Sequence, residues 1–223
     1  MPRQNYQSQL EDLRSAVCSM GDLVGDRYEQ AIEAYESGDE AIARQVIEGD
    51  QDVNERYLDL ENDCVDLIAL QQPVAGDLRF VVASFKIITD LERVADLATN
   101  LAAYGRDAGG IDLDPEIESI ATAGGEMLEA SIAAYREADT ASAFEVAARD
   151  DELDAACEAA SDRVVRGLVR QGSRTVDGEL EAIVAEASTT LLTIRDLERV
   201  GDHAVNIAAR TVYMTDSDDT LLY

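Results

Sequence analysis

The chain repeats one acidic heptapeptide, which reads DLERVAD at residues 90–96 and DLERVGD at residues 196–202. Apolar residues around both copies follow helical spacing, so Glu92 and Asp96 are expected one above the other on a helix face. Two carboxylates in this arrangement repel each other by about 0.2–0.5 kcal/mol. A hard cation would remove that repulsion, because carboxylate oxygens suit Mg, Mn, Ca or Fe better than thiophilic metals.

The second copy of the heptapeptide places Glu198 and Asp202 in the same way. The alternative to metal ligation is a face of solvated or arginine-paired acids, since acid pairs at this spacing are frequent in so acidic a chain. Arg93 and Arg199, each next to a glutamate, are not expected to lie between the two acids. Both copies keep the heptapeptide almost unchanged while other parts of the repeat differ. Spacing alone leaves both alternatives open.

The repeat extends well beyond the heptapeptide. Residues 87–103 lie over residues 193–209 at an offset of 106, and residues 34–50 lie over residues 134–150 at an offset of 100. The change of offset implies six inserted residues, which we place in the polar stretch 170–180. The chain is therefore a tandem duplication of a unit of about a hundred residues.

Each unit is predicted to form three long helices, because apolar residues recur at spacings of three and four. Short polar segments separate the helices, and Asp39 is an expected N-cap. Short connections make successive helices antiparallel neighbours. The predicted fold is therefore all-α, a tandem repeat of two antiparallel three-helix bundles, at residues 1–107 and 113–214, with a loosely held acidic tail at 215–223. The expected helices span about residues 4–36, 40–71, 77–105, 115–137, 140–171 and 178–213.

The middle helices supply further candidate ligands. Asp50 and Asp150 occupy equivalent positions early in these helices, and the residue four later is Asn54 in the first unit and Asp154 in the second. An antiparallel middle helix can bring these side chains opposite the heptapeptide and complete an oxygen-rich cluster. Capping or surface charge is the other interpretation.

The charge of the chain limits the classes of partner that it can bind. There are 47 acidic and 18 basic residues, a formal net charge of −29, and the acids are spread along the whole chain. We interpret this as adaptation to concentrated salt, where short Debye lengths screen self-repulsion. The alternative is that the acids bind metal or a basic partner. Nucleic acid is not an expected partner, since phosphate binding needs clustered bases. The densest group of arginines follows helical spacing and is expected to balance nearby acids: Arg163, Arg166, Arg170 and Arg174.

Several classes of protein are disfavoured. Cys18, Cys64 and Cys157 are odd in number and widely spaced, so they are expected to be core residues of a reducing compartment. No apolar run approaches the length of a membrane span and no signal-peptide core is present, which favours a cytoplasmic location. His203 is the single histidine. It is expected to be packed or hydrogen-bonded, and ferritin-like di-metal oxidases, which need Glu-x-x-His from two helices, are excluded.

Two segments, one in each unit of three helices, carry a family resemblance: LQQPVAGDLRFVVASFKIITDLERVADLATNLA (70–102) and RDLERVGDHAVNIA (195–208). With these segments the chain resembles the PhoU family over nearly its whole length. The resemblance implies a non-enzymatic regulator that acts beside a phosphate-specific ABC transporter at the cytoplasmic side of the membrane. It implies contact with the ATPase subunit of the transporter, restraint of phosphate uptake when phosphate is plentiful, and in many bacteria a sensor kinase as a second partner. A homodimer is also considered.

The resemblance further implies that the repeated acidic motifs bind metal ions, among which Fe, Zn, Mn and Mg are candidates. Carried over to this chain, the implied ligands are Glu92, Asp96, Glu198 and Asp202, with Asp50, Asp150 and Asp154 from the middle helices. Asn54 stands where the family usually has an acid, so weaker binding is expected in the first unit. Asp77 and Arg79 have no counterpart in the second unit and are predicted to mark a partner surface. The alternatives are a related regulator of another ion transporter or a transcription circuit, and a metal enzyme built on the carboxylates.

Overall fold

A computed structural model describes residues 2–109, 115–172 and 177–222, with side chains assigned from residue 6 and outside 171–179. Within these ranges the chain is helical and contains no strand, which confirms the predicted all-α class. The elements of the first unit are α1 (Pro2–Ser37), α2 (Glu40–Gln71) and α3 (Gly76–Ala108). Those of the second unit are α4 (Pro115–Glu137), α5 (Thr140–Ala148), α6 (Asp150–Gly172) and α7 (Asp177–Asp216), and η1 (Thr220–Leu222) follows.

Helix starts follow local chemistry that both units share. The side chain of Asp39 accepts hydrogen bonds from the backbone nitrogens of Ala41 and Ile42, at 2.7 and 3.3 Å, which confirms the predicted N-cap of α2. Asp139 caps α5 in the same way, with bonds of 3.0 and 3.3 Å. Such caps satisfy backbone donors that a helix cannot satisfy itself.

The middle helix of the second unit is not continuous, contrary to the single helix expected over 140–171. It breaks at Arg149, where α5 ends and α6 begins. The first turn of α6 carries Asp150, Asp151 and Glu152, and negative side chains stabilise a helix N-terminus. Asp150 therefore lies in the first turn of a new helix, and this helix packs against α7.

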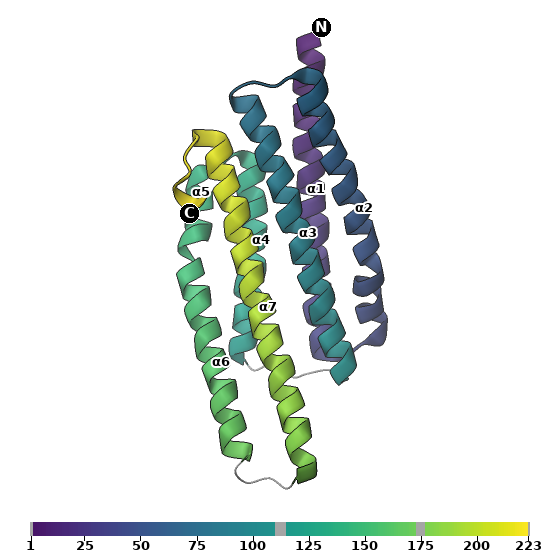
Figure 1. Ribbon diagram of the computed structural model, residues 1–223, viewed down its shortest axis with the longest axis vertical. Helices are drawn as coiled ribbons and strands as arrows, with labels where there is room; N and C mark the ends of the chain where they lie inside the picture. Colours follow the sequence, from purple (N-terminus) through teal and green to yellow (C-terminus); the bar gives the residue numbers. More distant parts are fainter. Residues whose placement is uncertain (1, 110–114, 173–176, 223) are drawn as a thin grey trace.

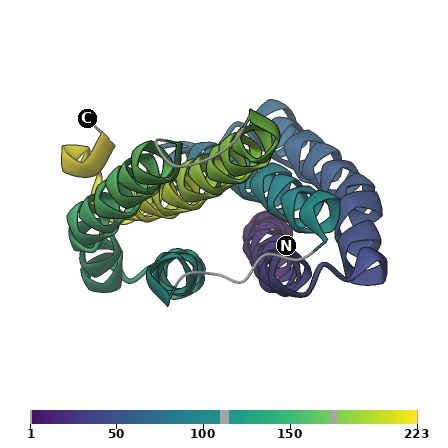
Figure 2. The ribbon, with the colours of Figure 1, turned by 90° about the horizontal axis from the view of Figure 1, so that it is seen from below.

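The two units pack side by side with their long axes antiparallel, α3 against α7 and α1 against α4. Seen end on, α6, α7, α3 and α2 form one layer and α1 and α4 form the other (Figure 2). Buried apolar residues of both units form one continuous core. Equivalent tyrosines each form a hydrogen bond to the other unit. The hydroxyl of Tyr35 accepts a 3.1 Å bond from Thr193, and the hydroxyl of Tyr135 shares a 2.7 Å bond with Ser84.

Three smaller expectations can be compared with the structure. All three cysteines are buried and free, as predicted. The tail is more ordered than expected, because α7 continues to Asp216 and Leu221 of η1 packs on the core. Part of the polar stretch 170–180, where six inserted residues are expected, lies outside the described residues. The helix α7 spans 40 residues and its counterpart α3 spans 33, so the second unit has the longer third helix.

The described members of the densest group of arginines lie on α6 of the second unit, and two of them pair with nearby acids, as expected. Arg163 pairs with Glu116, and Arg166 lies 2.9 Å from Asp162. Arg174 lies outside the described residues. Within the described ranges, none of the helices combines the length and hydropathy that a membrane span requires.

Candidate metal centre

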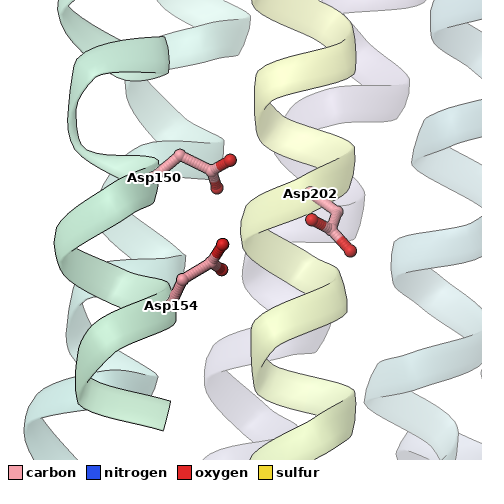
Figure 3. Close-up of side chains that lie close together, drawn as sticks. All are labelled: Asp150, Asp154 and Asp202. Carbon is pink, nitrogen blue, oxygen red and sulfur yellow. The ribbon is translucent and has the colours of Figure 1, made fainter. Parts of the chain in front are cut away.

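The second unit brings the predicted acids of α6 and α7 together. Asp150 and Asp154 point from α6 toward α7, which carries Asp202 (Figure 3). One carboxylate oxygen from each of the three lies within 4.8 Å of the others. Glu198 is one helical turn before Asp202 and is close enough to raise the pKa of Asp150. We call these four acids the α6–α7 cluster.

The electrostatics of the α6–α7 cluster suit a cation. Burial, followed by repulsion from Asp154 and Asp202, raises the pKa of Asp150 to about 6. Burial and the neighbouring acids also raise the pKa values of Glu198 and Asp202. The Oδ1 atom of Asp150 is buried and accepts no hydrogen bond from the described residues. A buried acceptor without a partner costs about 1–3 kcal/mol, which a bound cation would offset.

A glycine allows α6 to approach α7 at the α6–α7 cluster. A Cβ atom at Gly201 would lie 2.3 Å from Cδ2 of Leu153 and 3.8 Å from Oδ1 of Asp150. A contact of 2.3 Å is far inside van der Waals distance, so a larger residue would require the Leu153 side chain to move. The first unit has Ala95 at the equivalent position. The glycine against which Leu153 packs is therefore specific to the second unit.

The first unit assembles a different set of groups. Asn54 donates a 2.9 Å hydrogen bond to Oδ2 of Asp50, while Asp96 and Glu92 face them from α3. Burial is the first cause of the raised pKa values of Asp50 and Glu92, with repulsion from Asp96 next. An amide that donates to the carboxylate already satisfies it. We call Asp50, Asn54, Glu92 and Asp96 the α2–α3 cluster.

One expectation about the arginines is wrong in the first unit. Arg93 lies 3.4 Å from Glu92 and 3.4 Å from Asp96, so its guanidinium does bridge the two acids. Arg199 instead lies 3.9 Å from Asp196, which is fully buried. The α2–α3 cluster is thus partly neutralised by its own arginine, and only the α6–α7 cluster fits a cation well.

Hydrogen bonds between α3 and α7 link the first Asp of each heptapeptide to the other unit, and spacing within one helix did not predict them. His203 Nδ1 lies 2.9 Å from Asp90 Oδ1, and Asn206 donates to the same oxygen at 3.2 Å. At the equivalent position of the other unit, Asp196 accepts a 3.1 Å bond from Tyr104. The expectation that His203 is hydrogen-bonded is confirmed. The first Asp of each heptapeptide therefore faces the other repeat, a role that its repetition could have suggested.

The predicted partner residues lie at the far end of the first unit. Asp77 is half-buried in the first turn of α3, next to Tyr6 of α1, whose pKa is raised by burial and by Asp77. Arg79 is also half-buried, and its Nε atom donates no hydrogen bond to the described residues. Both residues are well away from the α2–α3 cluster, about four helical turns along α3 from Glu92.

The raised pKa of Asp150 makes a prediction about stability. Because the folded-state pKa, about 6, lies above the unfolded value of 3.8, the folded protein binds more protons between these values. The free energy of unfolding of the metal-free protein should therefore fall as pH rises from about 4 to 6. Thermal unfolding in EDTA should show a higher Tm at pH 5 than at pH 7, and Asp150→Asn should reduce that difference. An unchanged difference in the variant would contradict the assignment.

The fold and these clusters define a class of protein: a duplicated all-α bundle with one acidic cluster in each repeat. A family model described as "PhoU domain" matches residues 17–104 and 117–211. The chain belongs to the PhoU family.

Named relatives match over nearly the full chain. A phosphate-specific transport system accessory protein PhoU homolog of Clostridium acetobutylicum is 32% identical, with 96% of this chain and 95% of the relative covered. The Escherichia coli accessory protein PhoU is 30% identical, with 96% and 86% covered. The crystal structure of PhoU from Pseudomonas aeruginosa superposes with a TM-score of 0.85 at 29% identity, covering 96% of this chain and all of that one.

Proposed function

We propose that this chain is an accessory regulator of phosphate-specific transport that acts through protein contacts. The observation that carries the proposal is the match of both repeats to one family, together with full-length relatives named as accessory proteins of that transport system. An adaptor needs exposed rigid surfaces, and the long antiparallel helices supply them. The chain would work at the cytoplasmic side of the membrane.

The finer proposal is contact with the ATPase subunit of the phosphate-specific ABC transporter, with restraint of uptake when phosphate is plentiful. The charge of −29 supports a basic partner surface, because complementary charge speeds and orients association. A sensor kinase as second partner and a homodimer remain predictions. Regulation of a different transporter and metal-dependent catalysis are less well supported, since neither is suggested by the relatives' names.

We propose that the α6–α7 cluster holds a hard divalent cation, with Asp150, Asp154, Glu198 and Asp202 as ligands. The cation would supply positive charge that offsets four clustered carboxylates and would hold α6 against α7. Mn and Mg fit carboxylate oxygens best, and Fe and Zn remain candidates. Binding would stabilise the second unit, because a cation bound only to the folded state raises its stability by mass action.

The transporter contact can be tested with purified components. The protein should bind the purified ATPase subunit of the phosphate-specific transporter from the same host in biolayer interferometry. It should also slow phosphate uptake by proteoliposomes that contain the complete transporter, because a docked regulator restrains the ATPase cycle. The ATPase subunit of an unrelated peptide transporter is the control. Absence of binding together with unchanged uptake would refute the proposal.

A further inference from the structure

The helical hairpin formed by α2 and α3 exposes a row of large apolar side chains. Leu58, Val65 and Ile68 on α2 are 39–53% exposed, and Leu78 and Val82 on α3 are 37% and 40% exposed. We call these five residues the apolar strip. Leu70 and Val74, at the end of the hairpin, are 73% and 74% exposed. Single exposed apolar residues are ordinary, but a contiguous set marks an interaction surface.

The residues of the apolar strip share one face. Spacings of seven and three place Leu58, Val65 and Ile68 on one side of α2, and a spacing of four does the same for Leu78 and Val82. The helices pack as antiparallel neighbours on either side of a short turn at residues 72–75. Residues equally distant from the turn lie opposite each other, so Val65 and Val82 lie at the same level of the hairpin. The strip therefore runs along both helices, with Leu58 about two helical turns beyond Val65.

The second repeat shows that the fold does not require apolar side chains at two of these five positions, while Val165, Leu168 and Val184 keep the other three apolar. Glu158 stands at the position of Leu58, and Ser188 at the position of Val82. The same hairpin forms there as α6 and α7, although polar residues occupy these positions. Leu58 and Val82 thus serve something other than folding, and that purpose belongs to the first unit. Asp77 and Arg79, which also lack counterparts, flank Leu78 in the same hairpin.

The charges around the strip select the kind of partner. Glu55, Asp59 and Asp66 are exposed along α2 beside the apolar residues and outnumber Arg56 and Lys86, the exposed bases nearby in the same hairpin. A second copy of this chain would bring the same acids against them, and an anionic membrane surface would repel them. A complementary surface is apolar at its centre and bordered by Lys and Arg, the usual arrangement of an apolar interface core with a charged rim.

We propose that the apolar strip is the surface that docks on the ATPase subunit, against an apolar patch bordered by Lys and Arg. The inference rests on the proposed function and adds the site of contact to it. Docking is one-sided: the α2–α3 hairpin binds, while the α6–α7 hairpin, with Glu158 and Ser188 at two of the five positions, stays free for the metal cluster.

The test transfers the residues of the second repeat to the first. Leu58→Glu with Val82→Ser uses side chains that this hairpin accepts at the equivalent positions, so folding should be preserved. Affinity for the purified ATPase subunit should fall at least about tenfold, since a few buried apolar anchors supply most of the binding energy of an interface. Phe144→Ser with Leu192→Ser removes exposed apolar side chains outside the strip and should leave affinity unchanged. Thermal unfolding of both variants provides a check of the fold.

The outcomes separate the inference from the proposed function. If the wild-type protein binds and Leu58→Glu with Val82→Ser binds equally well, the strip is not the docking surface, and the proposed function stands. If the wild-type protein does not bind the ATPase subunit, both fail. Sedimentation showing self-association that the strip variant abolishes would assign the strip to a second copy. Strip-dependent binding to phosphatidylcholine–phosphatidylglycerol vesicles would assign it to a membrane. Either result overturns the proposal.

Discussion

Replacing Gly105 by alanine is expected to lower the free energy of unfolding by about 3 kcal/mol, at the upper end of the usual range for overpacking. Gly105 lies in α3, where α3 crosses α1. A Cβ atom there would lie 2.2 Å from Cα of Tyr35 and 2.7 Å from the carbonyl oxygen of Ala34. Both are backbone atoms, which cannot rotate away as a side chain can. The helices α1 and α3 would have to separate, and close-packed apolar contacts of the core would be lost.

Urea unfolding followed by circular dichroism measures this loss, with Gly167→Ala as the matched control. Gly167 lies inside α6, and a Cβ atom added there meets nothing within 4 Å. Alanine in an open helical position should stabilise the protein by about 0.5–1 kcal/mol, because glycine loses more backbone entropy on folding. A Gly105→Ala variant as stable as wild type would show that α1 and α3 are not held at this separation.

Removing two acids of the α6–α7 cluster is expected to weaken Mn²⁺ binding about a hundredfold. Glu198→Gln with Asp202→Asn keeps the shape of the side chains and removes two negative charges that no described ion pair neutralises. Even loss of an outer-shell partner usually costs 10–100-fold in metal affinity, so loss of direct ligands should cost at least as much. Isothermal titration of the chelator-treated protein with Mn²⁺ measures the change.

The first repeat offers the matched control for the metal prediction. Glu92→Gln with Asp96→Asn makes the same chemical change in the α2–α3 cluster, where Arg93 already bridges the two acids. Its effect on Mn²⁺ affinity should be much smaller. An equal loss in both variants would show that the two clusters bind metal alike. No loss in the Glu198 and Asp202 variant would remove the α6–α7 cluster as a metal site.

The sequence was a good guide wherever structure depends on neighbours along the chain. Helical spacing and the Asp39 cap located the helices within a few residues, because a helix is stabilised by contacts over one or two turns. The break at Arg149 was missed, since the acids that start α6 fit equally well inside a continuous helix. Salt adaptation, the metal ligands and the domain boundaries remain predictions.

The amino-acid sequence by itself determined that this protein is a duplicated helical bundle of the PhoU family with a carboxylate pair in each repeat. Only the tertiary structure decided what each pair can do. Arg93 and Arg199 occupy equivalent positions, yet Arg93 bridges its own acids, while Arg199 turns to the buried Asp196. Gly201 in place of Ala95 leaves room for the Leu153 side chain beside Asp150. The physical reason is that side-chain conformation and the packing of neighbouring helices choose among contacts that helical spacing leaves open, and no sequence pattern records that choice.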